Sequence, residues 1–262
     1  GNGAGAFYPE RVLKPLGADT SGSQFLEPDG NFPNHIPNPE NPQAMESISA
    51  ATVAAKADLG VIFDTDVDRA AIVAPDGSEI NRNSLIALIS AILLKDEKGA
   101  TIVTDSVTSD GLREFIVSHG GKHHRFKRGY KNVIDEAIRL NGEGVNAPLA
   151  IETSGHAALR ENYFLDDGAY LVTRIIIEAV RMKKAGKSLL SLISDLHTAK
   201  ESLEVRLSFS TTDWKNLGAF VIESLKKLKN PELTVAPDNY EGVRVSVPSL
   251  KGWFLVRMSV HD

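Results

Sequence analysis

Cysteine is absent from the 262 residues of the chain. This absence excludes disulfide bonds and thiolate metal sites, and it is compatible with a reducing compartment. No apolar run reaches the roughly 18 residues that a membrane-spanning helix needs, and no signal peptide is visible. Because the chain opens at Gly1 instead of Met, we expect its natural N-terminus to lie further upstream.

The chain also lacks an excess of basic residues. Its 29 Lys and Arg against 34 Asp and Glu leave a net charge of −5. Such a chain has no overall attraction to nucleic acids or to anionic membranes, so we expect neither as a partner. With 42% hydrophobic and 24% charged residues, the composition is that of a soluble globular protein, and the length suits roughly two domains.

Strand-like and helix-like segments alternate between about residues 100 and 184. Short apolar runs such as "ATIVTD" and "APLAIE" predict strands, and apolar residues at helical spacing predict helices over 109–119, 130–140 and 167–184. This alternation implies a parallel sheet covered on both faces. Upstream, a helix over about 44–57 precedes the strand "LGVIFD", and "AAIVAPDGSEI" predicts a hairpin that turns at "PDG".

The pattern changes near residue 199. "SLEVRLSF" alternates apolar and polar residues and predicts a strand with one exposed face. An amphipathic helix over 212–228 and strands over 242–248 and 252–259 follow. We expect a third, smaller α+β unit that is cut short at Asp262.

Three carboxylates stand at alternate positions in "VIFDTDVDR". Asp64, Asp66 and Asp68 follow an apolar strand-like run, at the point where α/β sheets place their ligands. In a tight loop all three can converge on one point, and a hard cation such as Mg²⁺ prefers oxygen ligands and removes their mutual repulsion. We therefore predict a divalent-metal site, with a solvated acidic turn as the alternative.

Two other carboxylate motifs fit this loop less well. An EF-hand that starts at Asp64 needs Gly at its sixth position and Glu at its twelfth, where the sequence has Arg69 and Pro75. Haloacid-dehalogenase phosphatases carry a similar D-x-D, but they expect Thr or Val where Asp68 stands. A phosphatase with Asp64 as its nucleophile is the weaker alternative.

The loop resembles the metal loop D-G-D-G-D-R of the α-D-phosphohexomutases, the family of phosphoglucomutases and phosphomannomutases. Thr65 and Val67 take the places of two glycines. "IETSGHAAL" resembles the family's sugar-recognition loop G-E-x-S-G-H, with Ile151 for the first Gly, and "DDGAY" resembles D-D-G-x-Y. "GNGAG", "DGNFPNHIPNPE" and "RGYKNVIDEA" are similar to further family segments. Together these motifs cover residues 1–185 in the family's order.

The resemblance implies four domains around a central cleft, of which this chain would hold the second, the third and part of the fourth. The expected fold is α/β, with two α/β/α domains of mixed, mostly parallel sheets over 1–95 and 96–198, and a truncated α+β domain over 199–262. The family's catalytic phosphoserine lies in a T-A-S-H-N-P segment of the first domain, which has no equivalent in this sequence. We therefore expect a fragment that lacks the first domain and is inactive alone.

The resemblance further implies an isomerase that moves a phosphoryl group between O1 and O6 of a hexose phosphate, through the phosphoserine and a hexose bisphosphate. Mg²⁺ would sit on Asp64, Asp66 and Asp68 and polarise the phosphoserine oxygen. Glu152 and Ser154 would hold the sugar's O3 and O4, whose positions are equivalent in both orientations of the sugar.

Four basic side chains would complete the cleft. Arg69 suits a two-point contact with phosphate, and a salt bridge to its Asp neighbours is equally plausible. His156 would bind phosphate or transfer a proton near neutral pH. Lys127 and Arg128 would line an anionic pocket beside a helix N-terminus, against the alternative of an exposed strand-to-helix junction.

The C-terminal "GWFLVRMSVHD" resembles the start of the family's phosphate loop, R-x-S-x-T-E-P. Arg257 and Ser259 match it and are predicted to bind substrate, whereas His261 and Asp262 replace Thr and Glu. These departures, with those at Thr65, Val67 and Ile151, support a second hypothesis: a non-catalytic relative that binds a sugar phosphate or a metal.

We expect a hexose phosphate as the ligand, and the sequence leaves open whether it is a glucose, mannose or glucosamine phosphate. We expect a monomer or weak dimer. The resemblance is closest to a plant or algal branch, which implies the cytoplasm or the plastid stroma.

Overall fold

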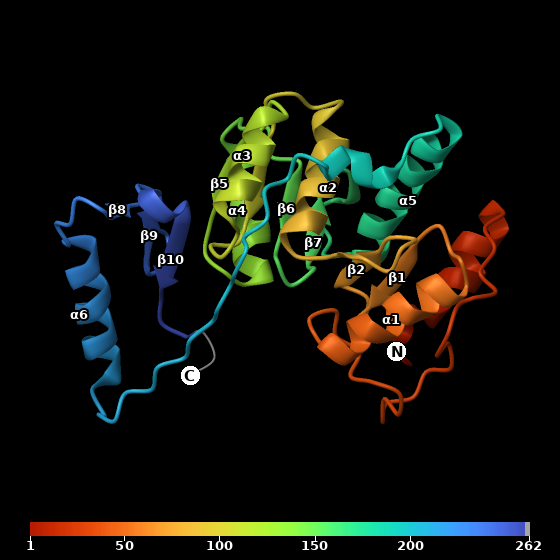
Figure 1. Cartoon of the computed structure of the whole chain (residues 1–262), viewed down its shortest axis with the longest axis horizontal. Helices are drawn as coiled ribbons and strands as arrows, with labels where there is room; N and C mark the ends of the chain where they lie inside the picture. The colour runs from red at the N-terminus through yellow and green to blue at the C-terminus, as the bar shows by residue number, and fades with distance from the viewer. Residues whose placement is uncertain (260–262) are drawn as a thin grey trace.

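Helix α2 (Asn83–Leu94) forms the centre of the core, because every residue from 85 to 94 is buried. A helix that is apolar on nearly all sides must be surrounded by other elements. It packs against α3 (Asp110–Ser118), α5 (Gly168–Lys184) and the 3-10 helix Leu189–Ile193. The computed structural model describes residues 1–259, and Figure 1 shows α2 between the N-terminal and C-terminal parts of an elongated molecule.

The N-terminal part contains a three-stranded antiparallel sheet of order β1-β2-β3. Its strands are β1 (Gly60–Phe63), β2 (Ala70–Val73) and β3 (Glu79–Ile80). The predicted hairpin at "PDG" is confirmed, and Gly77 supplies the left-handed residue of the turn with φ of +86°.

Helical segments precede and cover this sheet. Helix α1 (Pro42–Ala54) packs on β1 and β2, and Asn41 caps it by accepting a hydrogen bond from the Ala44 N–H at 3.1 Å. Ahead of α1 the chain forms three short helices, Ala4–Ala6, Pro9–Leu13 and Lys14–Leu16.

The middle part is built on a four-stranded sheet of order β5-β4-β6-β7. Strand β4 pairs parallel with β5 and β6, and β6 pairs antiparallel with β7. The strands are β4 (Thr101–Thr104), β5 (Lys122–Arg125), β6 (Leu149–Ile151) and β7 (Ala157–Leu159). The parallel pairing of β4 with β5 and β6 agrees with the prediction from the alternating pattern, and the antiparallel β7 makes the sheet mixed and mostly parallel, as the family resemblance implies.

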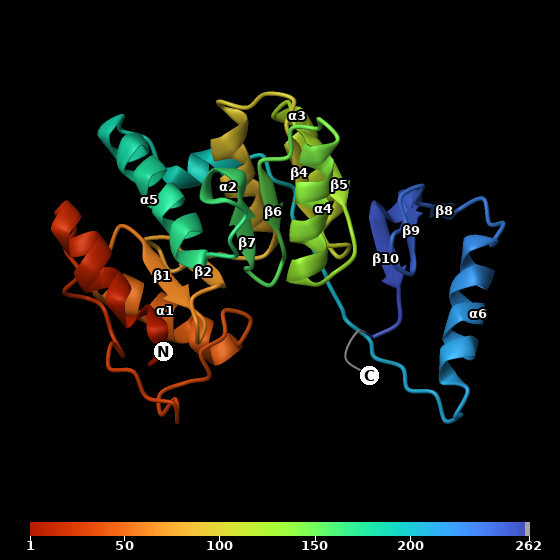
Figure 2. The same ribbon diagram turned by 180° about the vertical axis from the view of Figure 1, so that it is seen from behind.

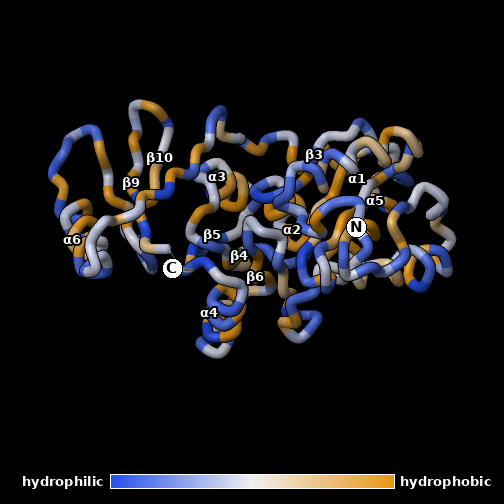
Figure 3. Tube along the Cα trace, turned by 90° about the horizontal axis from the view of Figure 1, so that it is seen from below, coloured by the Kyte–Doolittle hydropathy of each residue, from blue (hydrophilic) through white to orange (hydrophobic). Residues whose placement is uncertain are grey.

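Alternate residues of β4 face different layers of helices. Ile102 packs in the core cluster that contains α2, whereas Val103 packs against α4 (Tyr130–Gly142). The period of two residues in a strand explains this division. Helix α4 has one apolar face for the sheet, and Figure 3 shows its turns alternating between hydrophobic and hydrophilic residues. Helices therefore cover both faces of the sheet, and the predicted α/β fold is confirmed.

The C-terminal part is a small α+β unit that Figure 2 shows beside β5. It contains α6 (Trp214–Lys226) and an antiparallel sheet of order β10-β9-β8. Its strands are β8 (Thr234–Val235), β9 (Val243–Val247) and β10 (Gly252–Val256), and the 3-10 helix Pro248–Leu250 joins the last two.

The predicted strand "SLEVRLSF" is wrong. Residues 202–209 form no strand, and Leu203 is 86% exposed. Alternating apolar and polar residues favour a strand with one buried face. A strand also needs a neighbouring strand to pair with. Within residues 1–259 no strand pairs with this segment.

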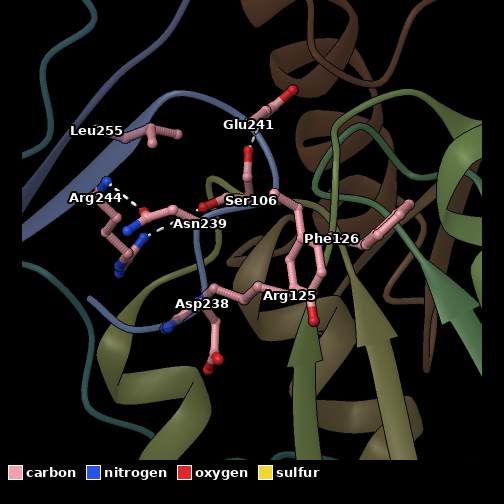
Figure 4. Close-up of a pocket in the computed structure, with 9 residues that line it drawn as sticks. Ser106, Arg125, Phe126, Asp238, Asn239, Glu241, Arg244 and Leu255 are labelled. Atoms are coloured by element: carbon pink, nitrogen blue, oxygen red, sulfur yellow. Dashed lines mark hydrogen bonds between the residues drawn. The ribbon is translucent and has the colours of Figure 1, made fainter. Parts of the chain in front are cut away.

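Buried arginines connect the C-terminal unit to the middle part. Asp110 of α3 accepts hydrogen bonds from Arg125 at 2.9 Å and from Arg244 of β9 at 2.8 Å. The Arg244 guanidinium also lies 3.6 Å from the centre of the Trp253 ring. Figure 4 shows the small pocket at this junction, where the Ser106 hydroxyl donates to Glu241.

None of the helices formed by residues 1–259 is long and apolar enough to cross a membrane.

Candidate active site

The loop that joins β1 to β2 brings the three predicted metal ligands together. One carboxylate oxygen from each of Asp64, Asp66 and Asp68 lies within 4.8 Å of the other two. The loop is held from inside, because Asp64 Oδ1 accepts hydrogen bonds from the backbone N–H groups of Val67 at 3.0 Å and Arg69 at 3.2 Å. The predicted convergence of the three acids is therefore possible in this fold.

Val67 adopts an unusual backbone for a β-branched residue. Its φ is +77°, in the left-handed region that favours glycine. Hydrogen bonds on both sides of the residue stabilise this strained conformation. Asp64 accepts from the Val67 N–H, and the Val67 carbonyl accepts from the Gly168 N–H at 3.0 Å. A Cβ at Gly168 would lie only 2.8 Å from that carbonyl oxygen. The tight loop thus depends on contacts from the start of α5.

Arg69 pairs with the acids of its own loop. Its Nε lies 2.8 Å from Asp64 Oδ2 and 3.9 Å from Asp68 Oδ1. Of its two predicted roles, the structure contains the salt bridge. Asp64 is 2% exposed and both its oxygens accept hydrogen bonds. A carboxylate can accept about four contacts through its two oxygens, so these hydrogen bonds leave room for a cation at Asp64.

The acids of the loop shift one another's protonation. Burial and the hydrogen bond with Asp64 raise the pKa of Asp68 to about 7. Burial alone would raise the pKa of Asp64 as well, but hydrogen bonds with Asp68 and Arg69 hold it below its ordinary value. Two neighbouring carboxylates without a cation between them therefore share a proton near neutral pH.

The donor set of this loop fits a hard divalent cation. All three donors are carboxylate oxygens. Asp68 Oδ1 is buried and accepts no hydrogen bond within residues 1–259, as expected of an oxygen whose partner is a cation. Asp68 also belongs to a second group of close donors, with His156 and Asp166.

The predicted sugar-recognition loop joins β6 to β7. Glu152 is 4% exposed, and its Oε1 accepts a hydrogen bond from the Gly129 N–H at 2.6 Å. The Ser154 hydroxyl donates to Glu152 Oε2 at 3.4 Å. Burial, with the charge of Asp105, raises the pKa of Glu152 to about 7. The two predicted sugar ligands thus lie side by side.

The two loops touch each other. The backbones of Arg69 and His156 form an isolated antiparallel bridge, and the Ala70 N–H donates to the Gly155 carbonyl at 3.4 Å. Gly155 has φ of +102°, and a Cβ there would lie 2.8 Å from the Ala70 carbonyl oxygen. This position therefore requires glycine, which allows the close approach of the two backbones.

His156 lies between the two loops. Its Nδ1 is 2.7 Å from Asp166 Oδ2 and 3.5 Å from Asp68 Oδ2. Burial alone would lower the pKa of His156, but these carboxylates outweigh burial and raise it. The Tyr130 ring stacks on the imidazole with ring centres 5.0 Å apart.

The remaining predicted basic residues of the middle part are Lys127 and Arg128. The positive charge of Arg128 lowers the pKa of both Glu152 and Asp105. The Lys127 ammonium lies 5.9 Å from the centre of the Phe126 ring.

Arg257 and Ser259 belong to the C-terminal unit. Arg257 follows β10, and its Nε lies 3.8 Å from Glu241. Neither the bonds nor the ion pairs of the described chain connect Arg257 to the aspartate loop. His261 and Asp262 lie outside the described residues.

Sequence reasoning missed three residues of this site: Asp105, Tyr130 and Asp166. Asp105 comes directly after β4, at the carboxyl end of a strand. The three-aspartate loop was predicted as a site because it stands in the same position after β1. Tyr130 and Asp166 stand inside quoted motifs but were given no role. Only their place in motifs that resemble family segments could have marked them, because the spacing of residues does not predict contacts with His156.

Comparisons with known proteins identify the family. The profile described as "Phosphoglucomutase/phosphomannomutase, alpha/beta/alpha domain II" matches residues 1–77, and the corresponding profile for domain III matches residues 81–199. The chain belongs to the phosphoglucomutase/phosphomannomutase family. The predicted family and its α/β/α architecture are thereby confirmed.

Curated members of this family match over nearly the whole chain. A phosphomannomutase/phosphoglucomutase of Pseudomonas syringae is 33% identical over 99% of this chain and 52% of its own length. A phosphoglucomutase of Neisseria gonorrhoeae is 31% identical over 99% of this chain and 53% of its own. The chain spans about half the length of these relatives.

A solved structure of a family member has the same fold as this chain. A phosphoglucomutase/phosphomannomutase family protein of Burkholderia thailandensis superimposes with a TM-score of 0.80 at 29% identity. The match covers 98% of this chain and 52% of that one. Since the relatives are named as mutases, the family is one of enzymes.

Proposed function

We propose that this chain supplies the metal-binding and sugar-binding parts of a phosphohexomutase, an isomerase that moves a phosphoryl group between O1 and O6 of a hexose phosphate. The observation that carries this proposal is the contact between the aspartate loop and the sugar-recognition loop at Arg69 and His156. Binding a hexose beside a divalent cation requires such a junction, and phosphoryl transfer depends mainly on positioning and on neutralising charge.

Each side chain would have its own part in this site. Glu152 and Ser154 would hold two neighbouring sugar hydroxyls, since their oxygens lie together on one loop. Arg128 would offset the negative charge of a phosphate beside that loop. His156, whose Nδ1 is held by Asp166, would bind phosphate oxygen or move a proton through its other ring nitrogen.

Arg69 would have a supporting role. The Nε of its guanidinium is already paired with Asp64. Arg69 would therefore contact a phosphate through its two terminal nitrogen atoms. Mg²⁺ held by Asp64, Asp66 and Asp68 would supply Lewis-acid stabilisation of negative charge on phosphoryl oxygen. The C-terminal unit would add Arg257 and Ser259 from a fourth domain that residues 199–262 begin.

The phosphoryl donor is proposed to be a serine outside these 262 residues, because the chain contains no T-A-S-H-N-P segment. A hexose bisphosphate would be the intermediate. We therefore expect no conversion of glucose 1-phosphate to glucose 6-phosphate by this chain alone, and turnover in a coupled assay would contradict this part of the proposal.

Calorimetry tests the binding role directly. We expect glucose 6-phosphate to bind more tightly than its 4-deoxy analogue and than inorganic phosphate. The variant Glu152→Gln should reduce this preference by about tenfold, the effect of one lost charged hydrogen bond. Glu143→Gln, an exposed glutamate at the end of α4, is the matched control. Equal affinity for the sugar phosphate and its deoxy analogue would overturn the proposed recognition of the hexose.

A further inference from the structure

Asp105 is a charged residue in a fully buried position. It follows β4 and is 0% exposed, whereas buried aspartates are rare unless they are paired. Its Oδ2 accepts hydrogen bonds from both the N–H of Thr153 at 3.0 Å and the hydroxyl of Thr153 at 2.6 Å. The other oxygen, Oδ1, is buried and accepts no hydrogen bond within residues 1–259.

Thr153 stands between the two predicted sugar ligands, Glu152 and Ser154. Strands β4 and β6 are parallel neighbours, with Thr104 opposite Ile151. Asp105 and Glu152 therefore leave the sheet at matching positions. The Asp105 carboxylate reaches across from one strand end to the middle of the loop that follows the other.

The charge of Asp105 also affects the pKa of Glu152. After burial, Asp105 is the main cause that raises the pKa of Glu152, while the Gly129 N–H, His156 and Arg128 act in the opposite direction. Burial likewise raises the pKa of Asp105, and the hydrogen bonds from Thr153, the charge of Arg128 and the Val107 backbone N–H partly offset this. Tyr130 lines a small pocket together with Glu152 and His156.

We propose that Asp105 is a positioning residue for the sugar-recognition loop. It holds Thr153 at two points and thereby fixes the orientation of the Glu152 carboxylate and the Ser154 hydroxyl toward a pair of hexose hydroxyls. Asp105 touches no substrate itself and acts only through Thr153 and through its charge. The ligand class in this inference rests on the proposed function.

Two variants separate this role from a purely structural one. Asp105→Asn keeps an oxygen acceptor for Thr153 but removes the charge. Thr153→Val removes the hydroxyl donor but keeps the backbone N–H. Glu178→Gln is the control, because Glu178 is a buried carboxylate on α5 that pairs with Lys95, on an element outside the sugar-recognition loop.

The measurements are the titration midpoint of Glu152, read by carboxyl-carbon NMR, and the affinity for glucose 6-phosphate, read by calorimetry. We expect Asp105→Asn to lower the midpoint by about one unit and to weaken binding about tenfold. Thr153→Val should weaken binding about threefold and shift the Ser154 amide resonance. Glu178→Gln should leave the midpoint and the affinity unchanged.

An Asp105→Asn protein with the same Glu152 midpoint and the same affinity as the unmodified chain would overturn the proposal. If Asp105→Asn does not fold, Thr153→Val provides the test. An unchanged affinity for glucose 6-phosphate together with an unchanged Ser154 amide resonance in Thr153→Val would overturn the proposal. Failure of the proposed function gives a different result. In that case the unmodified chain binds no glucose 6-phosphate, while the Glu152 midpoint still responds to Asp105→Asn.

Discussion

The backbone of Arg69 pairs with that of His156 in an isolated antiparallel bridge. Arg69 ends the loop of three aspartates, and His156 ends the loop that carries Glu152. Residues that are 87 positions apart in the sequence thus join two predicted binding loops into one surface. The proposed function depends on this junction, since either loop alone would be a polar turn.

The junction requires glycine at position 155. We expect Gly155→Ala to lower the free energy of unfolding by at least about 2 kcal/mol, because alanine is strained at φ of +102° and its Cβ would meet the Ala70 carbonyl oxygen. Urea denaturation measures this change. Gly142→Ala is the control, since a Cβ there, at the end of α4, meets no atom within 4 Å. Equal stability of the two variants would show that the loops are not in close contact.

Glu152 should make stability dependent on pH. Its pKa is about 7 in the folded protein against an ordinary value of 4.5, so the folded state keeps its proton where the unfolded state has lost it. This contribution is complete below about pH 4.5 and is lost as the pH rises through about 7. We expect the unmodified chain to lose up to about 3 kcal/mol more than Glu152→Gln over this interval. Parallel stability curves from chemical denaturation would contradict the shift.

Asp110 should hold the C-terminal unit in place. Replacing it with alanine leaves the guanidinium groups of Arg125 and Arg244 buried without their shared carboxylate. Because the Asp110 side chain is 38% exposed, we expect a smaller loss than for a fully buried pair, about 2 kcal/mol, and faster proteolysis in the exposed segment 199–212. The matched control is Glu204→Gln, which breaks an exposed ion pair with Arg206 and should change little. Unchanged proteolysis in Asp110→Ala would show that other contacts hold the unit.

Local pattern predicted much of the fold. The helices and the strands of the middle part follow from apolar spacing, because helices pack on both faces of that sheet. The failure of "SLEVRLSF" has a physical cause as well. Its alternation is real, but Leu203 and its neighbours find no strand to pair with in residues 1–259.

The site was only partly predictable. The spacing of Asp64, Asp66 and Asp68 placed three acids in one loop, but the inward hydrogen bonds of Asp64 depend on the backbone of Val67. Asp105 could not be found from spacing, because its partner Thr153 lies 48 residues away and becomes its neighbour only when β4 pairs with β6.

The central claim is that three neighbouring carboxylates are tolerated because a divalent cation sits among them. Its most direct test is calorimetric titration of the chain with Mg²⁺ above about pH 8, where Asp68 is ionised. Asp66 is the residue to change, because it is exposed and its carboxylate belongs to the group of three. Asp76→Asn, in the turn between β2 and β3, controls for the loss of one negative charge.

We predict a measurable binding heat for the unmodified chain and for Asp76→Asn, and an affinity at least about tenfold weaker for Asp66→Asn. No heat in any of the three proteins, or equal affinity in all of them, would contradict the account.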